Sequence, residues 1–261
     1  MSRVNGEESS AISVLDRGLQ FADGLFETIA FIHGKPRLWD RHMTRLASGC
    51  ARLDIRAPDA GVLRGEADRA CGDATRAIVK IMLTRGSGPI ASSRPTIIAA
   101  SRDWPADLDA RLRDGVVAHI SDTRISRNPR LAGIKHLNRL EYVLAENDRQ
   151  PDEASETILR DTQGYVIETC RANIFVVRDG RLYTPDLRYS GVSGVMRAEI
   201  MALARSLGIA ATVAWLTPRA LFGADEVFVT NAVMGVCPVR RIEDQALTVG
   251  PLTRTLQEAL A

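Results

Sequence analysis

The stretch that decides the fold reads Asn-Pro-Arg-Leu-Ala-Gly-Ile-Lys-His-Leu-Asn-Arg-Leu-Glu and spans residues 128–141. Its first half is rich in turn formers and predicts a loop, and the segment that follows predicts a helix over His136–Asn147. Lys135 is therefore expected at the junction between this loop and this helix. A lysine in such a place is usually a solvated surface cation, so position alone leaves both a structural and a catalytic interpretation open.

Lysine is scarce in this chain. Of the 34 lysine and arginine residues only three are lysines, namely Lys35, Lys80 and Lys135. A lysine can lose its proton near neutral pH and act as a nucleophile, whereas an arginine cannot. Each lysine is therefore a candidate for chemistry, and scarcity alone does not decide among them.

The composition is that of a folded globular protein. The chain has 261 residues, of which 45% are apolar and 25% charged, enough for one large domain or two smaller ones. A net charge of +2 and scattered arginines argue against a nucleic-acid partner. The N-terminus lacks the apolar core of a signal peptide and no long apolar run follows, so we expect a cytoplasmic protein without membrane contact. The four cysteines lie far apart without a C-x-x-C pair, so we expect no metal site and no disulfide framework.

Local patterns predict a mixed architecture in the first part of the chain. The loop over residues 84–89 is expected to join two sheet strands, and the limit of a first domain is placed between residues 105 and 125. The predicted strands are Glu27–Ile32, Ala77–Leu83 and Thr96–Ala100, with a helix over Leu38–Leu53.

The second part is dominated by strands. An Asp-Gly pair at 179–180 predicts a hairpin turn, and a Gly-Val-Ser-Gly loop at 191–194 precedes a predicted helix. The predicted elements are the strands Val116–Ile120, Glu156–Arg160, Tyr165–Glu168, Asn173–Val177, Leu182–Thr184 and Glu226–Thr230, with a helix over Val195–Leu207. The fold class is therefore α/β (α+β), with a smaller N-terminal α/β domain over residues 1–115 and a larger, strand-rich C-terminal domain over residues 116–261.

Glu168 is the most informative carboxylate. It closes a strand that should be half buried, and an unpaired buried carboxylate costs several kcal/mol. Its partner is either one of the many arginines or a protonated pyridine nitrogen, and the residues leave both open.

The remaining candidates are ambiguous when taken singly. Val192 and Ser193 lie in a loop before a helix, where free backbone amides and the helix dipole favour an anion, although such loops are also common N-caps. Taken alone, Arg45 could be an ordinary solvated residue of a helix, and Asn231 an ordinary turn residue at the end of a strand. The histidines His42 and His136 are interpreted either as structural or as residues that support a site from behind its contact residues, since the chain has no G-x-S-x-G motif and no metal-ligand spacing.

Together these segments resemble the fold type IV family of pyridoxal 5′-phosphate enzymes, also called the class IV aminotransferase family. The resemblance runs through nearly the whole chain in order, and the implied architecture is the two-domain fold of the D-amino acid aminotransferase type. The segments that carry it are Asp-Arg-Gly-Leu-Gln-Phe-Ala-Asp-Gly-Leu-Phe-Glu-Thr (16–28), His-Met-Thr-Arg-Leu (42–46), Leu-Ala-Gly-Ile-Lys-His-Leu-Asn-Arg-Leu-Glu (131–141), Glu-Thr-Cys-Arg-Ala-Asn-Ile-Phe (168–175), Gly-Val-Ser-Gly-Val-Met-Arg (191–197) and Thr-Asn-Ala (230–232).

The resemblance implies a role for each candidate. It places the cofactor pyridoxal 5′-phosphate as a Schiff base on Lys135, with Glu168 on the pyridine nitrogen. It assigns the cofactor phosphate to the side chain of Arg45, to the loop of Val192 and Ser193, and to the backbone of Ala232 with Asn231 nearby. It also implies a small-molecule substrate and a homodimer.

The activity implied by the resemblance has two versions. Residues 128–141 and 191–197 are most similar to lyases that act on 4-amino-4-deoxychorismate, while an aminotransferase acting on D-amino or branched-chain amino acids would use the same lysine and glutamate. One departure bears on substrate, because many such lyases continue Arg85-Gly86-Ser87-Gly88 with Gly-Arg-Gly-Tyr, whereas this chain continues with Pro-Ile-Ala-Ser-Ser at 89–93. A non-catalytic ligand-binding protein on the same scaffold is the alternative from another class.

Overall fold

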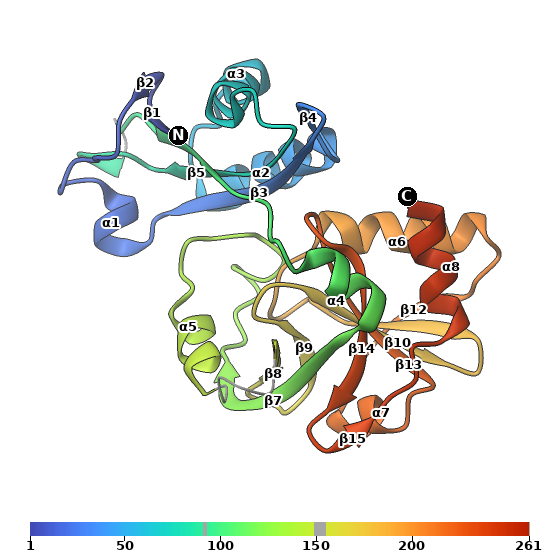
Figure 1. Cartoon of the computed structure of the whole chain (residues 1–261). Coiled ribbons are helices and arrows are strands. Elements are labelled where there is room, and N and C mark those ends of the chain that lie inside the picture. The colour runs from blue at the N-terminus through green and yellow to red at the C-terminus, as the bar shows by residue number, and fades with distance from the viewer. Residues whose placement is uncertain (91–92, 149–154, 261) are drawn as a thin grey trace. The chain divides into compact units, whose positions relative to one another are not determined.

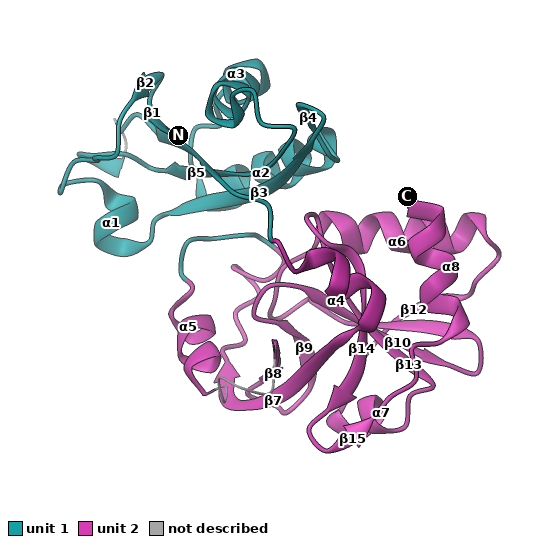
Figure 2. Ribbon diagram, viewed as in Figure 1, with its two compact units in different colours: residues 1–105, 134–138 teal, residues 106–133, 139–261 magenta. Residues whose placement is uncertain are grey.

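The computed structural model describes residues 1–90, 93–148 and 155–260. The chain divides into two compact units, shown in teal and magenta in Figure 2. Unit 1 comprises Met1–Pro105 and Ile134–Asn138, and unit 2 comprises Ala106–Gly133 and Arg139–Ala261. Both units combine helices with a sheet, so the predicted α/β class is confirmed.

Unit 1 is built on an antiparallel sheet (Figure 1). In the described part of the chain the strand order is β2-β1-β6-β5-β3-β4, and the long strands β3 and β5 pair over their whole length. The strands are β1 (Ser2–Val4), β2 (Glu7–Glu8), β3 (Gly24–Ile32), β4 (Lys35–Pro36), β5 (Arg76–Thr84) and β6 (Thr96–Arg102), and the helices are α1 (Arg17–Phe21), α2 (Trp39–Leu53) and α3 (Ala60–Cys71).

The two faces of this sheet differ in character because side chains alternate along a strand. Leu25, Ile29 and Phe31 on β3 are fully buried on the face that packs against α2. Gly49 lets α2 approach closely, since a Cβ there would come within 2.9 Å of the Leu25 side chain. The opposite face carries half-buried residues, among them Phe26.

A buried carboxylate fixes the hairpin between β5 and β6. Asp16 is 1% exposed; its Oδ1 accepts from the Gly18 amide at 2.7 Å, and its Oδ2 accepts from the hydroxyls of Thr84 at 2.9 Å and Thr96 at 2.7 Å. A Cβ at Gly18 would overlap the Thr84 side chain. Both ends of the connection after β5 are therefore held by one residue of the segment that precedes α1.

Unit 2 holds a larger sheet with helices packed around it (Figure 1). Among the described residues its strand order is β12-β11-β10-β13-β14-β7-β8-β9, with β15 paired to β14. The strands are β7 (Val116–Ile125), β8 (Glu156–Asp161), β9 (Val166–Thr169), β10 (Asn173–Arg178), β11 (Arg181–Pro185), β12 (Ala211–Ala214), β13 (Glu226–Asn231), β14 (Gly235–Ile242) and β15 (Gln245–Ala246). The helices are α4 (Leu108–Asp114), α5 (Leu140–Asn147), α6 (Val195–Ser206), α7 (Pro218–Phe222) and α8 (Pro251–Leu260).

Most of the predicted elements are present. The helices α2 and α6 and the predicted strands match within a few residues at their ends. The hairpin between β10 and β11 turns at Asp179 (φ 51°) and Gly180 (φ 69°), the left-handed pair that such a turn requires.

The helix predicted over His136–Asn147 is wrong in its first turn. Helix α5 begins at Leu140, and the residues just before it are not helical. The cause is a long-range pairing with β3, in which the Phe26 amide donates to the Lys135 carbonyl and the Leu137 amide donates to the Gly24 carbonyl, each at 2.9 Å. Lys135 therefore lies in a non-helical segment that pairs with β3, ahead of the start of α5, rather than directly at a loop-to-helix junction.

The division into units differs from the predicted limits of 1–115 and 116–261 at two places. The first unit ends at Pro105, and α4 belongs to unit 2 because it packs against β14. The segment Ile134–Asn138 groups with unit 1, which places Lys135 there rather than in the C-terminal unit. None of the helices described is both long and apolar enough to cross a membrane.

Candidate active site

Glu168 is a buried carboxylate that several elements of unit 2 hold in place. It lies near the end of β9 and is 3% exposed. The Tyr142 hydroxyl donates to its Oε1 at 2.7 Å, while the Asn173 amide group and the Val192 backbone amide donate to its Oε2 at 3.1 and 3.0 Å. Because these donors come from α5, β10 and the loop before α6, the carboxylate has a fixed position and a fixed orientation.

The loop before α6 is shaped to reach Glu168. Gly191 has φ +84°, and a Cβ there would lie 2.6 Å from Ile167 and 3.3 Å from the Glu168 carboxyl carbon. Asn173 also donates to the Val192 carbonyl at 2.8 Å, so it binds the loop and the carboxylate at once. Only glycine allows the backbone this close to the acid.

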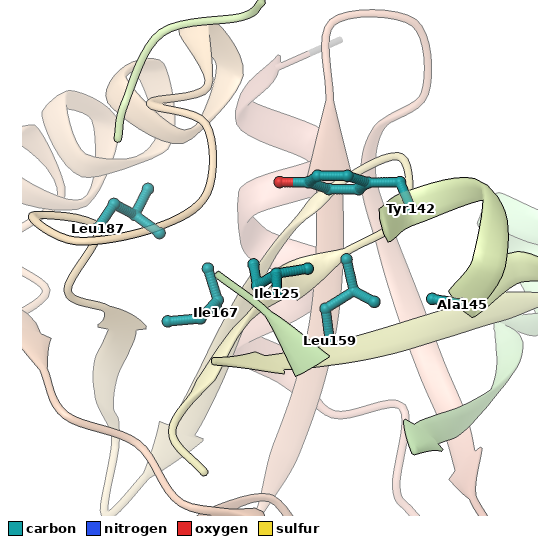
Figure 3. Close-up of a cluster of buried hydrophobic side chains, with 6 residues drawn as sticks. All are labelled: Ile125, Tyr142, Ala145, Leu159, Ile167 and Leu187. Carbon is teal, nitrogen blue, oxygen red and sulfur yellow. The ribbon is translucent and has the colours of Figure 1, made fainter. Parts of the chain in front are cut away.

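Tyr142 connects this carboxylate to a hydrophobic cluster (Figure 3). The cluster joins α5 to strands β7, β8 and β9, and the Tyr142 hydroxyl points away from α5. Burial raises the pKa of Tyr142, and the negative charge of Glu168 raises it further, so the hydroxyl stays protonated and acts as a donor. Besides Tyr142 the cluster contains Ile125, Ala145, Leu159, Ile167 and Leu187.

Arg139 covers the outer face of the tyrosine. Its guanidinium carbon lies 3.1 Å from the centroid of the Tyr142 ring, and its Nη2 donates to the Cys170 carbonyl at 3.4 Å. Its Nη1 is buried and has no hydrogen-bond partner in the described part of the chain. A buried guanidinium nitrogen of this kind can serve as a donor to a bound anion or polar ligand.

Two backbone amides of the loop at 191–194, which was predicted to bind an anion, already donate hydrogen bonds within the protein. The Val192 amide donates to Glu168, and the Ser193 amide donates to the Gly133 carbonyl at 3.0 Å, because the loop is needed to hold the acid. Helix α6 starts after Gly194 without a side-chain cap and without an acidic residue in its first turn. A Cβ at Gly194 would overlap the Asn173 amide oxygen. The backbone amides in the first turn of α6 therefore have no side-chain cap, and such amides favour an anion.

Asn231 and Ala232 form the turn between β13 and β14. The Asn231 side-chain oxygen accepts from the amides of Val233 and Met234, both at 3.0 Å, so this residue shapes the turn. Ala232 is 8% exposed. Their role toward a phosphate stays a prediction, but the turn is near the loop, since Asn173 pairs across the sheet with the neighbouring Thr230.

Lys135 lies in unit 1 beside β3. Its Nζ is 4.4 Å from the centroid of the Phe26 ring, and the Phe26 amide donates to its carbonyl. This hydrogen bond anchors the backbone of Lys135 to β3 and so holds its Cα in a defined position.

Arg45 belongs to a buried ion cluster on the opposite face of the same sheet. Its Nε donates to the Glu27 Oε1 at 2.8 Å and its Nη2 donates to Oε2, while His42 Nδ1 lies 2.6 Å from Oε2. Burial alone would raise the pKa of Glu27, but the charge and hydrogen bonds of Arg45, with His42, lower it to about 2. Arg45 is thus not a solvated surface residue of the helix. Its assignment to a cofactor phosphate stays a prediction.

The cysteines offer no activated nucleophile. Burial raises the pKa of Cys50 to about 11 and those of Cys170 and Cys237 to about 12. Such thiols stay protonated at neutral pH and behave as small apolar side chains. The part of the chain that the structure describes contains no group of histidine, cysteine and carboxylate residues suited to a metal ion.

Sequence reasoning therefore found Glu168 but missed its surroundings. Within unit 2 the structure brings Glu168 together with Val192, and the turn at Asn231 lies beside them. Tyr142 and Asn173 were not singled out, because a tyrosine in a helix and an asparagine at a strand start carry no signal of a partner far along the chain.

Comparison with known proteins decides the family. The model of the class IV aminotransferases, "Amino-transferase class IV", matches residues 24–242. The chain belongs to the class IV aminotransferase family.

Individual members of the family match over nearly the whole chain. An aminodeoxychorismate lyase of Vibrio harveyi is 35% identical over 97% of both chains, and a putative branched-chain-amino-acid aminotransferase of Methanocaldococcus jannaschii is 30% identical over 97% of this chain and 91% of its own. The crystal structure of 4-amino-4-deoxychorismate lyase from Pseudomonas aeruginosa superimposes with a TM-score of 0.94 at 39% identity, covering 100% of this chain and 98% of that one. The predicted membership and the predicted fold are confirmed.

Removal of the Tyr142 hydroxyl tests its support of Glu168. Tyr142→Phe keeps the ring in the cluster but leaves the buried carboxylate one donor short, so we expect the free energy of unfolding to fall by about 1–3 kcal/mol. Urea unfolding followed by circular dichroism measures this. Tyr183→Phe on β11 is the matched control, and equal effects of the two substitutions would contradict the role given to Tyr142.

The ion cluster at Glu27 predicts a pH-dependent contribution to stability. Glu27→Gln leaves Arg45 without its carboxylate, so we expect the free energy of unfolding at pH 7 to fall by about 3 kcal/mol. Because the folded pKa is about 2 and the ordinary value is 4.5, the contribution is complete above the ordinary value and is lost as pH falls toward 2.

The difference between wild type and Glu27→Gln should therefore narrow by roughly 1 kcal/mol between pH 7 and pH 3.5. Thermal unfolding at both pH values measures it, with the exposed Glu8→Gln as the control. A difference that stays constant over this range would show that the charge of Glu27 is not what stabilises the unit.

Proposed function

We propose that this protein is a pyridoxal 5′-phosphate-dependent 4-amino-4-deoxychorismate lyase, which releases pyruvate and forms 4-aminobenzoate. The observation that carries the proposal is the match to lyases of this activity over essentially the whole chain, at 35% identity to the relative from Vibrio harveyi and 39% to the solved structure from Pseudomonas aeruginosa. The identity to three aminotransferases is lower, at 30% and 29% for two relatives and 25% for a solved structure.

The residues present fit this cofactor. A pyridine ring needs a fixed acid or carboxylate at its nitrogen, and Glu168 is buried and oriented by three donors. A phosphate needs backbone amides, and α6 begins at an uncapped Gly194 where a side chain would overlap Asn173. The buried Nη1 of Arg139 offers one further donor.

Each residue then has a role in holding the group. Lys135 would bind its aldehyde carbon covalently, and Glu168 would keep the pyridine nitrogen protonated. Arg45, Val192, Ser193, Asn231 and Ala232 would hold the phosphate, as the family resemblance implies. When bound, pyridoxal phosphate supplies an electron sink for the negative charge that develops at the amine-bearing carbon of the substrate.

The chain's own part in the reaction is proton transfer and orientation. The side-chain amine of Lys135 would serve as the base that removes the proton from the amine-bearing carbon of the substrate. Lys135 would then return this proton to the enolpyruvyl group, whose bond to the ring breaks so that it leaves as pyruvate, and the ring becomes aromatic. Tyr142 and Asn173 keep Glu168 in one orientation throughout and exclude water from its oxygens.

The second candidate is an aminotransferase acting on D-amino or branched-chain amino acids. The same lysine and glutamate serve both reactions, so these two residues do not separate them. The substitution of residues 89–93 relative to many lyases is the feature that favours this alternative, and residues 91 and 92 of that segment lie outside the described part of the chain.

We further propose a homodimer in the cytoplasm. Support for the dimer comes from the large apolar side chains that unit 1 exposes around α1, namely Val14 at 75%, Leu15 at 62%, Leu19 at 61% and Phe21 at 63%. Monomeric proteins seldom leave such a group uncovered. Light scattering of the purified protein gives the mass that decides this.

A product assay tests the function. Purified protein loaded with pyridoxal phosphate is incubated with 4-amino-4-deoxychorismate, and we expect 4-aminobenzoate and pyruvate in equal amounts. In parallel, D-alanine with 2-oxoglutarate should give pyruvate at a rate at least about 100-fold lower, because a lyase pocket is selected for a different substrate.

Lys135→Ala is the control for enzyme-catalysed turnover and should lower the rate by more than about 1000-fold, since it removes the proposed base. Absence of 4-aminobenzoate with rapid pyruvate formation from D-alanine would replace the lyase by the aminotransferase.

A further inference from the structure

Glu156 is a second buried carboxyl group of unit 2, and the proposed function gives it no role. It is the first residue of β8 and is 4% exposed. The hydroxyl of Thr169, the last residue of β9, donates to its Oε2 at 2.7 Å. Burial raises the pKa of Glu156, and the hydrogen bond from Thr169 opposes this. Burial of a carboxyl group is unfavourable, and an apolar side chain would fill the same volume without that penalty.

The register of β8 and β9 places Glu156 and Glu168 on opposite faces of the sheet. Ile158 pairs with Thr169, and Leu159 pairs with Glu168. Since cross-strand partners and residues two apart on a strand share one face, Glu156 lies diagonally across from Thr169, on the face that Glu168 does not use. An effect of Glu156 on the orientation of Glu168 therefore passes through the backbone that joins them.

Thr169 begins a tight turn, residues 169–172, that connects β9 to β10. Its backbone amide donates to the Ala172 carbonyl at 2.7 Å, and the Ala172 amide donates to its hydroxyl oxygen at 2.9 Å. Glu168 directly precedes this turn, and Asn173, which donates to the Glu168 carboxylate at 3.1 Å, directly follows it. The hydroxyl that donates to Glu156 thus belongs to the turn that carries both the acid and one of its donors.

The 169–172 turn is also bound by two other residues of the candidate site. The Nη2 of Arg139 donates to the Cys170 carbonyl at 3.4 Å, and the Nδ2 of Asn231 donates to the Arg171 carbonyl at 3.3 Å. One turn therefore connects Glu168 with residues of α5 and of the β13–β14 connection. A shift of its backbone would disturb several contacts at once.

We propose that Glu156 is a positioning residue for Glu168, an inference that rests on the proposed function. By accepting the Thr169 hydroxyl it fixes the 169–172 turn, and this turn holds Glu168 and Asn173 in the orientation that a pyridine nitrogen requires. The alternative is that Glu156 contributes only to the stability of unit 2.

Two cofactors that differ only at the ring nitrogen separate these roles. The apoprotein is titrated with pyridoxal phosphate and with the analogue in which a C–H group replaces the pyridine nitrogen. Wild type should prefer pyridoxal phosphate by at least about 10-fold, because only this ring offers a protonated nitrogen to Glu168. Glu156→Leu should reduce this preference to less than about 3-fold, whereas a loss of stability alone would weaken binding of both compounds equally.

Further variants locate the effect. Thr169→Val removes the hydroxyl and keeps the branched shape, and we expect the same loss of preference. Glu156→Gln keeps an oxygen that can accept from Thr169 and should retain the preference. Thr157→Val is the matched control, because this buried neighbour on β8 has a hydroxyl without a hydrogen-bond partner among the described residues. Glu226→Leu removes another buried glutamate, which accepts from the first amides of α8, and should lower stability while keeping the preference.

A double substitution tests whether Glu156 acts through Glu168. In a Glu168→Gln background the preference for pyridoxal phosphate should already be lost, so Glu156→Leu should change it no further. An additional loss in that background would overturn the proposal, since Glu156 would then act on the ring by another route. The proposal is overturned as well if Glu156→Leu or Thr169→Val keeps the preference, or if wild type shows none.

Failure of the proposed function has a different signature. If pyridoxal phosphate binds and no 4-aminobenzoate forms, the lyase assignment fails, and the preference still decides the role of Glu156. If the protein takes up neither compound, the proposed function fails altogether, and hydrogen exchange of the apoprotein decides. The backbone amides of Ala172 and Val192 should then exchange at least about 10-fold faster in Glu156→Leu than in wild type, and equal rates would overturn the positioning role.

Discussion

The arrangement of unit 2 depends on the burial of one carboxylate. Removing Glu168 from water is unfavourable unless its oxygens receive hydrogen bonds, and the chain meets this need with donors from a helix, a strand and a loop. The same requirement explains the glycines at 191 and 194, which let the loop backbone approach Ile167, Glu168 and Asn173. The carboxylate that we propose for the pyridine nitrogen thus also organises the surrounding backbone.

Unit 1 separates two electrostatic environments by the thickness of a sheet. On one face Glu27 is buried with Arg45 and His42, a cluster that joins β3 to α2. On the other face the Nζ atoms of Lys80 and Lys135 lie 4.7 and 4.4 Å from the centroid of the Phe26 ring. Alternation along β3 is sufficient to keep these groups apart, so a strand of nine residues serves both packing and chemistry.

The sequence patterns correctly predicted those helices and turns that depend on residues close to one another in the chain. The spacing of apolar residues identifies α2 and α6, and the Asp179-Gly180 pair identifies its hairpin, because turn geometry depends on those two residues alone. The start of α5 was mispredicted because Lys135 and its neighbours pair with β3, more than a hundred residues earlier in the chain. No local periodicity records such a pairing.

The candidate site shows the same division. The residue types of Lys135 and Glu168 and the resemblance around them were enough to name them, whereas Tyr142, Asn173 and Glu27 emerge only from tertiary contacts. Glu27 in particular sits within an apolar strand, and its partner Arg45 follows 18 residues later on a helix. A glutamate is usually expected at the surface, whereas Glu27 is 1% exposed in the structure.

Of the three lysines in the chain, we propose that Lys135 holds the cofactor. Borohydride reduction of the protein loaded with pyridoxal phosphate makes the link permanent, and proteolysis with mass spectrometry then locates it. We expect a single phosphopyridoxyl modification, on the peptide that contains Lys135. Modification of Lys80 or Lys35 in its place, or a protein that takes up no cofactor, would contradict it.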